Sequence, residues 1–185
     1  MDFISGSSSS LSKSVSDQLA QYRYRVFIEG LGWELDTEQG VEADQFDRPD
    51  TQYVVARDEK ARIIGCARLL PTTEPYLLEQ VFPQLLNGME PPKSEEIWEL
   101  SRFAAVDLAN GKLSRSGQFS SVTTLELLAA AADCARRNGA KRLISVSPVG
   151  VERLLRHTGF RAHRAGPPMI IDGYPLFACW IEIDS

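Results

Sequence analysis

The sequence predicts an α/β fold, a single domain over residues 1–185 built as a three-layer α-β-α sandwich around a mixed sheet. The 185 residues fit one ordinary domain, and 43% hydrophobic against 24% charged residues indicates a packed core. Segments with helical spacing alternate with short runs rich in Val and Ile, which is typical of helices packed on a sheet. The absence of any internal repeat excludes a solenoid.

The chain is expected to begin with a flexible stretch, residues 1–13, because this stretch contains a run of serines. A helix follows, for which Ser14 or Ser16 is placed to cap the start and Gly30 and Gly32 to form the end. Its apolar residues at helical spacing are Val15, Leu19, Tyr22 and Val26.

A long loop and then a β-hairpin are predicted next. Residues 34–50 are acidic and have no periodicity, so they are expected to form a loop, and loops of this length are often functional. Residues 52–57 and 62–70 are rich in Val and Ile and flank the charged turn 58–61, which predicts two paired strands. Pro71 ends the second strand.

The middle of the chain predicts a short helix over 77–86 around Pro83, a strand over 97–106 and a flexible loop over 108–120. A second long helix follows, and Gly139 occupies the position at which a left-handed residue ends a helix. The residues predicted to share its apolar face are Val122, Leu125, Leu128, Ala129 and Ala132.

The last third predicts a strand over 141–147, a short helix over 149–157 ended by Gly159, and a final strand over 176–183. The pair 172–173, Asp-Gly, is typical of the turn that joins two strands. The predicted elements therefore alternate between helix and strand to the end of the chain.

The composition of the chain limits which partners and which cellular compartment are expected. No apolar run approaches the ~20 residues that span a bilayer, and the start lacks a basic region followed by an apolar one. We therefore expect a cytoplasmic protein with no membrane partner. Cys66, Cys134 and Cys179 are widely spaced and have no Cys or His at metal-ligand spacing, so they are expected to be small buried residues.

A basic segment lies within a chain whose net charge is −5. Between residues 136 and 164 it contains eight Lys and Arg against one acid, Glu152. The basic residues are Arg136, Arg137, Lys141, Arg142, Arg153, Arg156, Arg161 and Arg164. The segment is either an ordinary solvated face or a docking site for an acidic partner, and nucleic acid is not expected because no recognised motif accompanies it.

Arg23 and Phe27 lie four residues apart on the first predicted helix and therefore share a face, and Trp33 follows soon after that helix ends. The two aromatic residues are either core or part of a pocket for a cationic sulfur and an adenine ring. A positively charged sulfur is attracted to aromatic faces, and a carboxylate of the same ligand is attracted to an arginine.

Four carboxylates lie within the acidic loop and need cations nearby, for which Arg68 and Arg102 are the candidates. The four are Glu42, Asp44, Asp47 and Asp50. A Ca²⁺ site is the alternative, but the loop lacks the central Gly and terminal Glu of a calcium-binding loop, so we expect no metal.

Glu99 and Arg102 lie three apart on a predicted strand, where strict alternation sends their side chains to opposite faces. A β-bulge would bring both to one face, and bulges often lie beside active sites. Otherwise one of the two residues is structural.

These residues together resemble the signature of LuxI-type acyl-homoserine-lactone synthases, in order and with matching spacing through most of the chain. The matching pieces are Arg23-x-x-x-Phe27, Trp33, Glu42-x-Asp44-x-x-Asp47, Arg68-Leu-Leu-Pro-Thr-Thr and Glu99-Leu-Ser-Arg102-Phe. The stretch from His163 to Pro168, sequence HRAGPP, resembles that of the medium- and long-chain members.

The resemblance implies a GNAT-like fold with a twisted sheet split by a V-shaped cleft. It also implies a reaction in which the amine of S-adenosylmethionine attacks an acyl thioester. The methionine carboxylate then attacks its own γ-carbon, and methylthioadenosine leaves. S-adenosylmethionine is a substrate in this reaction and no cofactor is implied.

Acyl carrier protein is the acyl donor that the resemblance favours, although some members of the family use acyl-CoA. The glycine-rich loop that holds CoA pyrophosphate in GNAT enzymes does not follow Val106. This absence disfavours the alternative of a GNAT-type acyl-CoA N-acyltransferase. A non-catalytic sensor of an acyl or adenosyl ligand is the other alternative.

The resemblance also assigns roles to residues. Glu99 is the expected base, because an attacking amine must be neutral. Asp44 and Asp47 are expected to pair with Arg102 and Arg68, and Glu42 belongs to the same catalytic set. The S-adenosylmethionine site is expected to comprise Arg23, Phe27, Trp33 and Phe103.

The remaining roles concern the acyl donor. The acyl pocket is expected to comprise Leu100, Ser101, Leu125, Leu128, Ser145 and Ser147, and the carrier docking site Lys141, Arg142, Arg153 and Arg156. The two hydroxyls of the β-strand, Ser145 and Ser147, either hold a β-oxygenated acyl chain or bond the neighbouring backbone.

Overall fold

The computed structural model of the chain describes residues 1–109, 122–157 and 159–183. It divides into two compact units: unit 1 comprises Met1–Arg68 with Arg102–Ala131, and unit 2 comprises Leu69–Ser101 with Ala132–Ser185. Most of the predicted loop over 108–120 lies outside the described residues.

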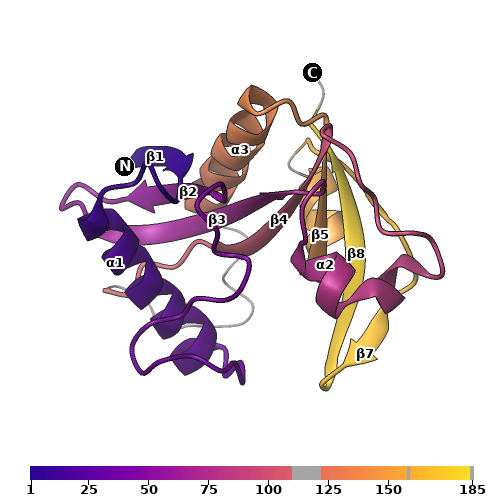
Figure 1. Cartoon of the computed structure of the whole chain (residues 1–185), viewed down its shortest axis with the longest axis horizontal. Coiled ribbons are helices and arrows are strands. Elements are labelled where there is room, and N and C mark those ends of the chain that lie inside the picture. The colour runs from indigo at the N-terminus through magenta and orange to yellow at the C-terminus, as the bar shows by residue number, and fades with distance from the viewer. Residues whose placement is uncertain (110–121, 158, 184–185) are drawn as a thin grey trace. The chain divides into compact units, whose positions relative to one another are not determined.

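The strands form one mixed, open sheet in the order β1-β2-β3-β4-β5-β8-β6, with β7 paired to β8 (Figure 1). β4 and β5 are parallel, whereas the pairs β1–β2, β5–β8, β6–β8 and β7–β8 are antiparallel. The strands are β1 (Asp2–Ser7), β2 (Gln52–Arg57), β3 (Ile63–Pro71), β4 (Ile97–Ala104), β5 (Arg142–Pro148), β6 (Arg161–Arg164), β7 (Met169–Ile171) and β8 (Tyr174–Glu182). The predicted α/β class with a mixed sheet is confirmed.

The helical elements lie between these strands, although β3 directly follows β2, and β6, β7 and β8 follow one another. They are α1 (Lys13–Arg23), the π-helix η1 (Tyr24–Gly30), α2 (Leu77–Val81), the 3₁₀ helix η2 (Pro83–Leu86), α3 (Val122–Arg137) and α4 (Val151–His157). The long loop predicted over 34–50 contains neither helix nor strand.

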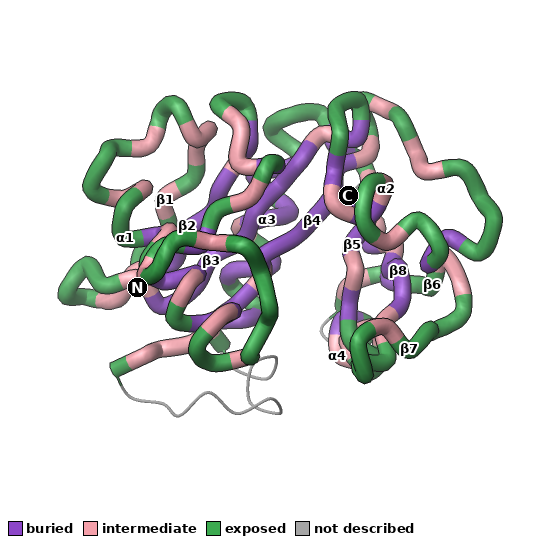
Figure 2. Tube along the Cα trace, turned by 60° about the horizontal axis from the view of Figure 1, so that its bottom comes forward, coloured by how far each residue is buried: buried purple, intermediate pink, exposed green. Residues whose placement is uncertain are grey.

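Unit 1 has helices on both faces of its strands. On one face α1 and η1 pack against the sheet through a buried apolar cluster that includes Tyr22, Val26 and Cys66. On the other face α3 approaches β3 so closely that a Cβ added at Gly65 would lie 3.1 Å from the side chain of Leu127. Figure 2 shows β3 buried along most of its length, because it is covered on both faces.

The start of the chain differs from the expected flexible stretch. Residues Asp2–Ser7 form the edge strand β1, which pairs antiparallel with all of β2, from Asp2 opposite Arg57 to Ser7 opposite Gln52. Serines do not exclude a strand here, because the backbone groups of β2 supply the hydrogen bonds. The cap of α1 is Ser12, whose side chain accepts from the Val15 N–H at 3.3 Å, in place of the expected serines.

The first helix changes to a π-helix where a continuous α-helix was expected. The N–H of Leu31 donates to the carbonyl of Val26, five residues earlier, and that of Trp33 donates to Phe27. A π-helix inserts an extra residue in a turn and is common at functional sites. Side-chain periodicity does not reveal it, because one extra residue leaves the apolar pattern almost unchanged.

The buried face of α3 is rotated from the predicted one. Leu128 and Ala132 are buried as expected, but Leu125 and Ala129 are exposed and Leu127 is fully buried. Gly65 explains the difference, because its missing side chain leaves the space that Leu127 fills. Leu125 is therefore the member of the predicted acyl pocket that the structure places on the surface.

Unit 2 contains the strands β5, β8, β6 and β7. The predicted Asp-Gly turn joins β7 to β8, and both of its residues have positive φ, 49° at Asp172 and 80° at Gly173. The short strands β6 and β7 were not predicted, because β6 is four and β7 three residues long and neither forms a clear apolar run.

Candidate functional site

Six charged side chains of unit 1 form a network of three cations and three carboxylates. They are Arg23, Arg68, Arg102, Glu42, Asp44 and Asp47. The arginines come from α1, β3 and β4, and the acids from the loop that precedes β2. Arg68 and Glu42 are 0% exposed, so the network lies inside the unit with its formal charges balanced.

Glu42 joins two of the arginines. Its Oε2 accepts from Nε of Arg23 at 2.5 Å, and its Oε1 accepts from Nε and Nη2 of Arg102 at 3.1 and 3.0 Å. A buried carboxylate is stable only where its oxygens have such partners. Glu42 therefore fixes the distance between α1 and β4.

The two aspartates complete the network. Asp44 accepts from Arg68 Nη1 at 2.6 Å and from Arg102 Nη2 at 2.8 Å. Asp47 accepts from Arg23 at 2.8 and 3.1 Å and from Arg68 at 3.1 Å. The expected pairing of Asp44 with Arg102 and of Asp47 with Arg68 is confirmed, and Arg23 is an additional partner.

The electrostatics follow from this geometry. Burial alone would raise the pKa of Asp47, but the charges and hydrogen bonds of Arg23, Arg68 and Tyr53 hold that pKa well below its usual value. Burial alone would lower the pKa of Arg23. The negative charges and hydrogen bonds of Asp47, and to a smaller extent those of Glu42, instead raise this pKa well above its usual value. Asp47 and Arg23 are therefore both charged at neutral pH.

An aromatic stack adjoins the network. The rings of Phe27 and Trp33 are stacked with centroids 4.7 Å apart and planes 23° from parallel. The guanidinium carbon of Arg102 lies 5.7 Å from the first centroid and 5.4 Å from the second, so it lies alongside the stack. Phe27 is buried, whereas Trp33 is 37% exposed.

The expected convergence of a cation, a ring and an indole is thus present, but the cation is Arg102. Arg23 instead donates to Glu42 and Asp47. Phe103, also expected in this pocket, lies half-buried on β4. The backbone of β4 departs from regular strand conformation at Arg102 itself, whose φ is +49°.

Glu99 lies in unit 2, fully buried, at the start of α2. Its Oε2 accepts from the N–H of Leu77 at 3.0 Å and its Oε1 from the N–H of Leu78 at 2.7 Å. The carboxylate thus satisfies two N–H groups of the first helical turn, which have no partner within a helix. The base predicted from the sequence is therefore also a helix cap.

The remaining residues of the predicted acyl pocket differ in burial. Leu100, Ser101, Leu128, Ser145 and Ser147 are buried. The hydroxyls of Ser145 and Ser147 lie 2.9 Å apart and bond one another, which neither alternative for this pair had anticipated.

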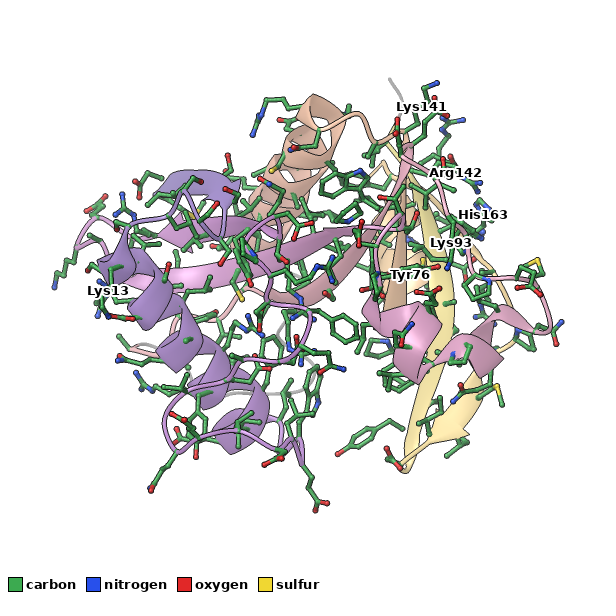
Figure 3. The ribbon with its side chains drawn as sticks, in the orientation of Figure 1. Lys13, Tyr76, Lys93, Lys141, Arg142 and His163 are labelled. Carbon is green, nitrogen blue, oxygen red and sulfur yellow. The ribbon has the colours of Figure 1, made fainter. Side chains whose placement is uncertain are left out.

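The predicted docking residues belong to unit 2 and are partly neutralised within it. Lys141 pairs with Glu96 at 2.5 Å and Arg156 with Glu152 at 2.8 Å. Arg142, labelled in Figure 3, pairs with Glu182 at 3.0 Å, and its guanidinium carbon lies 4.1 Å from the centroid of the Trp180 ring. These contacts leave Arg142 half-buried. Arg153 is exposed on α4.

The family model for autoinducer synthases matches residues 7–185. This chain belongs to the autoinducer synthase family. An acyl-homoserine-lactone synthase of Acinetobacter nosocomialis is 56% identical to this autoinducer synthase over 183 residues, which is 99% of this chain and 100% of the relative. Membership of the family makes the chain an enzyme, an acyltransferase.

Solved structures of acyl-homoserine-lactone synthases have the same fold as this chain. TofI in a ternary complex with an inhibitor and MTA superposes with a TM-score of 0.85 at 47% identity, covering 100% of this chain and 92% of TofI. BjaI, described as a CoA-dependent acyl-homoserine lactone synthase with SAM and isopentyl-CoA, gives 0.84 at 26% identity, covering 97% and 82%. A putative N-acetyltransferase from Lactobacillus plantarum, 21% identical with a TM-score of 0.64 and covering 98% and 97%, shares the GNAT-like fold.

Within the described part of this autoinducer synthase, no helix is long and apolar enough to cross a membrane. The same residues include no group of three or more His, Cys, Asp or Glu arranged to hold a metal ion.

Two residues of the site were missed by the sequence reasoning. The hydroxyl of Tyr53 donates to Asp47, and the thiol of Cys66 donates to the Arg102 carbonyl. Both lie on strands among apolar neighbours, where a Tyr or Cys is read as core. Only the pairing of the strands brings them to the network.

Proposed function

We propose that this autoinducer synthase makes an acyl-homoserine lactone from S-adenosylmethionine and an acyl thioester and releases methylthioadenosine. The lactone is the quorum-sensing signal. The observation that carries the proposal is the Phe27–Trp33 stack beside Arg102 and its balanced network of buried charges. The family and the relatives named above support the same reaction.

The aromatic stack suits the sulfonium and the adenine of S-adenosylmethionine. A sulfonium is attracted to the face of an indole, and adenine stacks on one. Arg23 uses three of its five N–H donors on Glu42 and Asp47, so a ligand carboxylate can add to these bonds without replacing them. Phe103 would complete the pocket.

The proposed reaction has two steps. The neutral amine attacks the thioester carbonyl, which forms the amide and expels the thiol. The methionine carboxylate then attacks its own γ-carbon, which closes the lactone and breaks the carbon–sulfur bond to methylthioadenosine. The network of Glu42, Asp44, Asp47, Arg68 and Arg102 would hold the substrate in place for both steps.

Glu99 is the proposed base for the amine proton, directly or through a water molecule. Its two bonds to backbone N–H groups hold the carboxylate at the start of α2, so capping and proton transfer must be measured separately.

The acyl chain is proposed to contact the buried residues Leu100, Ser101, Ser145 and Ser147 of unit 2. Each buried methylene contributes about 0.8 kcal/mol, so such a pocket would discriminate between chain lengths. A medium or long chain is proposed from the HRAGPP stretch.

Acyl carrier protein is the proposed donor, docking on Lys141, Arg142, Arg153 and Arg156. Acyl-CoA is the alternative, since BjaI is described as CoA-dependent. S-adenosylmethionine is a substrate and no cofactor is proposed. The cytoplasm is the proposed compartment because both substrates are made there.

The test is a reaction of the purified chain with S-adenosylmethionine and acyl thioesters, followed by mass spectrometry. We expect an acyl-homoserine lactone and an equimolar amount of methylthioadenosine. The yield of both products should fall in Trp33→Ala and should be retained in Trp33→Phe, which keeps an aromatic ring. Ligand binding without methylthioadenosine would identify a sensor. An N-acylated product of another amine would identify a general N-acyltransferase.

A further inference from the structure

The thiol of Cys66 makes a long-range hydrogen bond inside unit 1. Its Sγ donates to the backbone carbonyl of Arg102 at 3.1 Å, between strands β3 and β4. Cys66 is 1% exposed, and burial raises the pKa of its thiol to about 12. The sulfur therefore keeps its proton at neutral pH and can act as a donor.

The acceptor of this bond belongs to a residue in an uncommon conformation. Arg102 has φ +49°, a left-handed value that residues other than glycine rarely adopt and that is held only where the surroundings fix it. The strands approach closely at this point, because a Cβ added at Gly65 would lie 3.2 Å from the Ala104 carbonyl. The absent side chain of Gly65 lets the next residue, Cys66, reach β4.

The conformation of Arg102 decides where its guanidinium lies. From this position Nε and Nη2 reach Glu42 and Nη2 reaches Asp44, and the guanidinium lies alongside the aromatic stack. An extended residue in a regular strand would direct its side chain elsewhere. Whatever fixes the Arg102 backbone therefore fixes the charge beside the proposed substrate site.

We propose that Cys66 is a positioning residue, whose S–H···O bond holds the Arg102 backbone so that its guanidinium stays between the carboxylate network and the aromatic stack. The role in substrate binding rests on the proposed function, whereas the bond between the two strands does not. The donor hydrogen is the essential feature, and the sulfur's size is secondary.

Another buried thiol, that of Cys179, offers a comparison. Cys179 is also fully buried, on β8 of unit 2, where its Sγ lies 3.6 Å from the carbonyl of its neighbour Trp180. Cys179→Ala therefore removes a buried thiol without touching Arg102 and serves as the matched control.

The first test compares Cys66→Ala, Cys66→Val and Cys66→Ser in the full chain. Loss of one buried hydrogen bond predicts a KM for S-adenosylmethionine roughly fivefold higher in the Ala and Val variants. The KM for the acyl donor should stay unchanged. Cys66→Ser restores a donor and should return the KM to within about twofold of wild type, as should Cys179→Ala.

The second test is the ¹⁵N NMR signal of the Arg102 Nε–H, which reports its bond to Glu42 without requiring turnover. We expect this signal to move toward its position in free arginine in Cys66→Ala and to recover in Cys66→Ser. If the wild type makes no lactone, the proposed function is wrong. The Arg102 Nε–H signal would still show whether the Cys66 thiol holds Arg102 in place.

Three results would overturn the proposal. One is an unchanged KM and Nε signal in Cys66→Ala. Another is rescue by Val as complete as rescue by Ser, which would assign a packing role. The third is that Cys66→Ser is as unstable to denaturant as Cys66→Ala. If Cys66→Ala does not fold, the proposal requires that Cys66→Ser does fold, and failure of both variants would overturn it.

Discussion

Arg23, Arg68 and Arg102 would repel each other inside unit 1 if each lacked a carboxylate. Glu42, Asp44 and Asp47 supply one negative charge for each positive one, and every carboxylate joins two arginines. The consequence is mutual dependence: removal of one member leaves two partners buried with an unbalanced charge.

The acid dependence of stability should reflect Asp47. Its folded pKa lies below the value of 3.8 of an unperturbed aspartate, so its contribution is present above that pH and is lost as the pH falls through the folded value. Asp47→Asn should lower the free energy of unfolding at pH 7 by about 3–5 kcal/mol. It should also make the free energy of unfolding decrease less steeply as the pH falls below ~4. Denaturant titrations at pH 7 and 3 measure both effects, with Asp50→Asn as the control.

Tyr53 should control stability at alkaline pH. Burial, followed by the charge of Asp47, raises the folded pKa of Tyr53 above the ordinary value of 10.0. Its contribution is therefore complete below pH 10 and is lost as the pH rises further. Tyr53→Phe should lower stability at neutral pH by about 1–3 kcal/mol, the cost of losing a hydrogen bond to a charged group, and should flatten the alkaline decline. An identical decline in the variant would contradict this assignment.

The hydroxyl pair on β5 should affect product selection. Ser145 and Ser147 bond each other, so one proton of the pair remains for a further acceptor, such as a β-oxygen on the acyl chain. Ser147→Ala should lower the ratio of β-oxygenated to unsubstituted product by roughly fivefold, as expected for one hydrogen bond. Mass spectrometry of competing acyl donors gives this ratio, and an unchanged ratio would refute the role.

At the scale of elements, short helices are held by side chains from strands. α2 is five residues long, too short to be stable alone, and its first N–H groups bond to Glu99 from β4. Tyr76, just before the helix, donates its hydroxyl proton to the carbonyl of Pro92 (Figure 3). The position of α2 thus depends on tertiary contacts.

Glu99→Gln should therefore have two effects. The amide has a single acceptor oxygen, and its NH₂ group would face a backbone N–H of α2, which costs about 1–3 kcal/mol of stability. Loss of the proposed base should also lower turnover by about 10²–10⁴-fold. Unfolding curves and kcat, measured below the unfolding temperature, separate the two.

The control for this experiment is Glu79→Gln, which changes an acid on α2 that pairs with the exposed Lys93 at 2.9 Å. Full activity in a destabilised Glu99→Gln would restrict Glu99 to capping. Lost activity at unchanged stability would instead leave it as a base alone.

At the scale of the whole molecule, the chain carries a net charge of −5 but concentrates basic residues between positions 136 and 164, a segment of unit 2. Arg142 is a poor probe of this surface, because its pairing with Glu182 and its contact with Trp180 make it structural. Arg153 is exposed on α4 and is the better probe.

Arg153→Glu should raise the KM for acyl carrier protein by several-fold, and added salt should raise the wild-type KM likewise. Lys60→Glu makes the same charge change on an exposed turn of unit 1 and should leave the KM unchanged. Unaltered carrier kinetics and salt dependence in Arg153→Glu would mean that the basic residues are an ordinary solvated face.

The sequence by itself determined the α/β class, most helices and strands, and the charged and aromatic residues of the site. It did so because apolar periodicity, turn residues and the order of the motif residues are local features of the chain. Crowded carboxylates require cations nearby, which indicated Arg68 and Arg102, and the resemblance implied their pairing with Asp47 and Asp44.

Tertiary structure alone decided the hydrogen-bond partners of Arg23, Arg102, Glu99, Tyr53 and Cys66. Arg102 replaced Arg23 beside the aromatic stack because the β4 backbone takes a left-handed turn that strand propensity does not encode. Glu99 became a cap because α2 begins beside it. The start of the chain became a strand because β2 left an edge to pair. Each outcome depends on which strands and helices come together, and a hydrogen-bond partner distant in sequence leaves no local pattern.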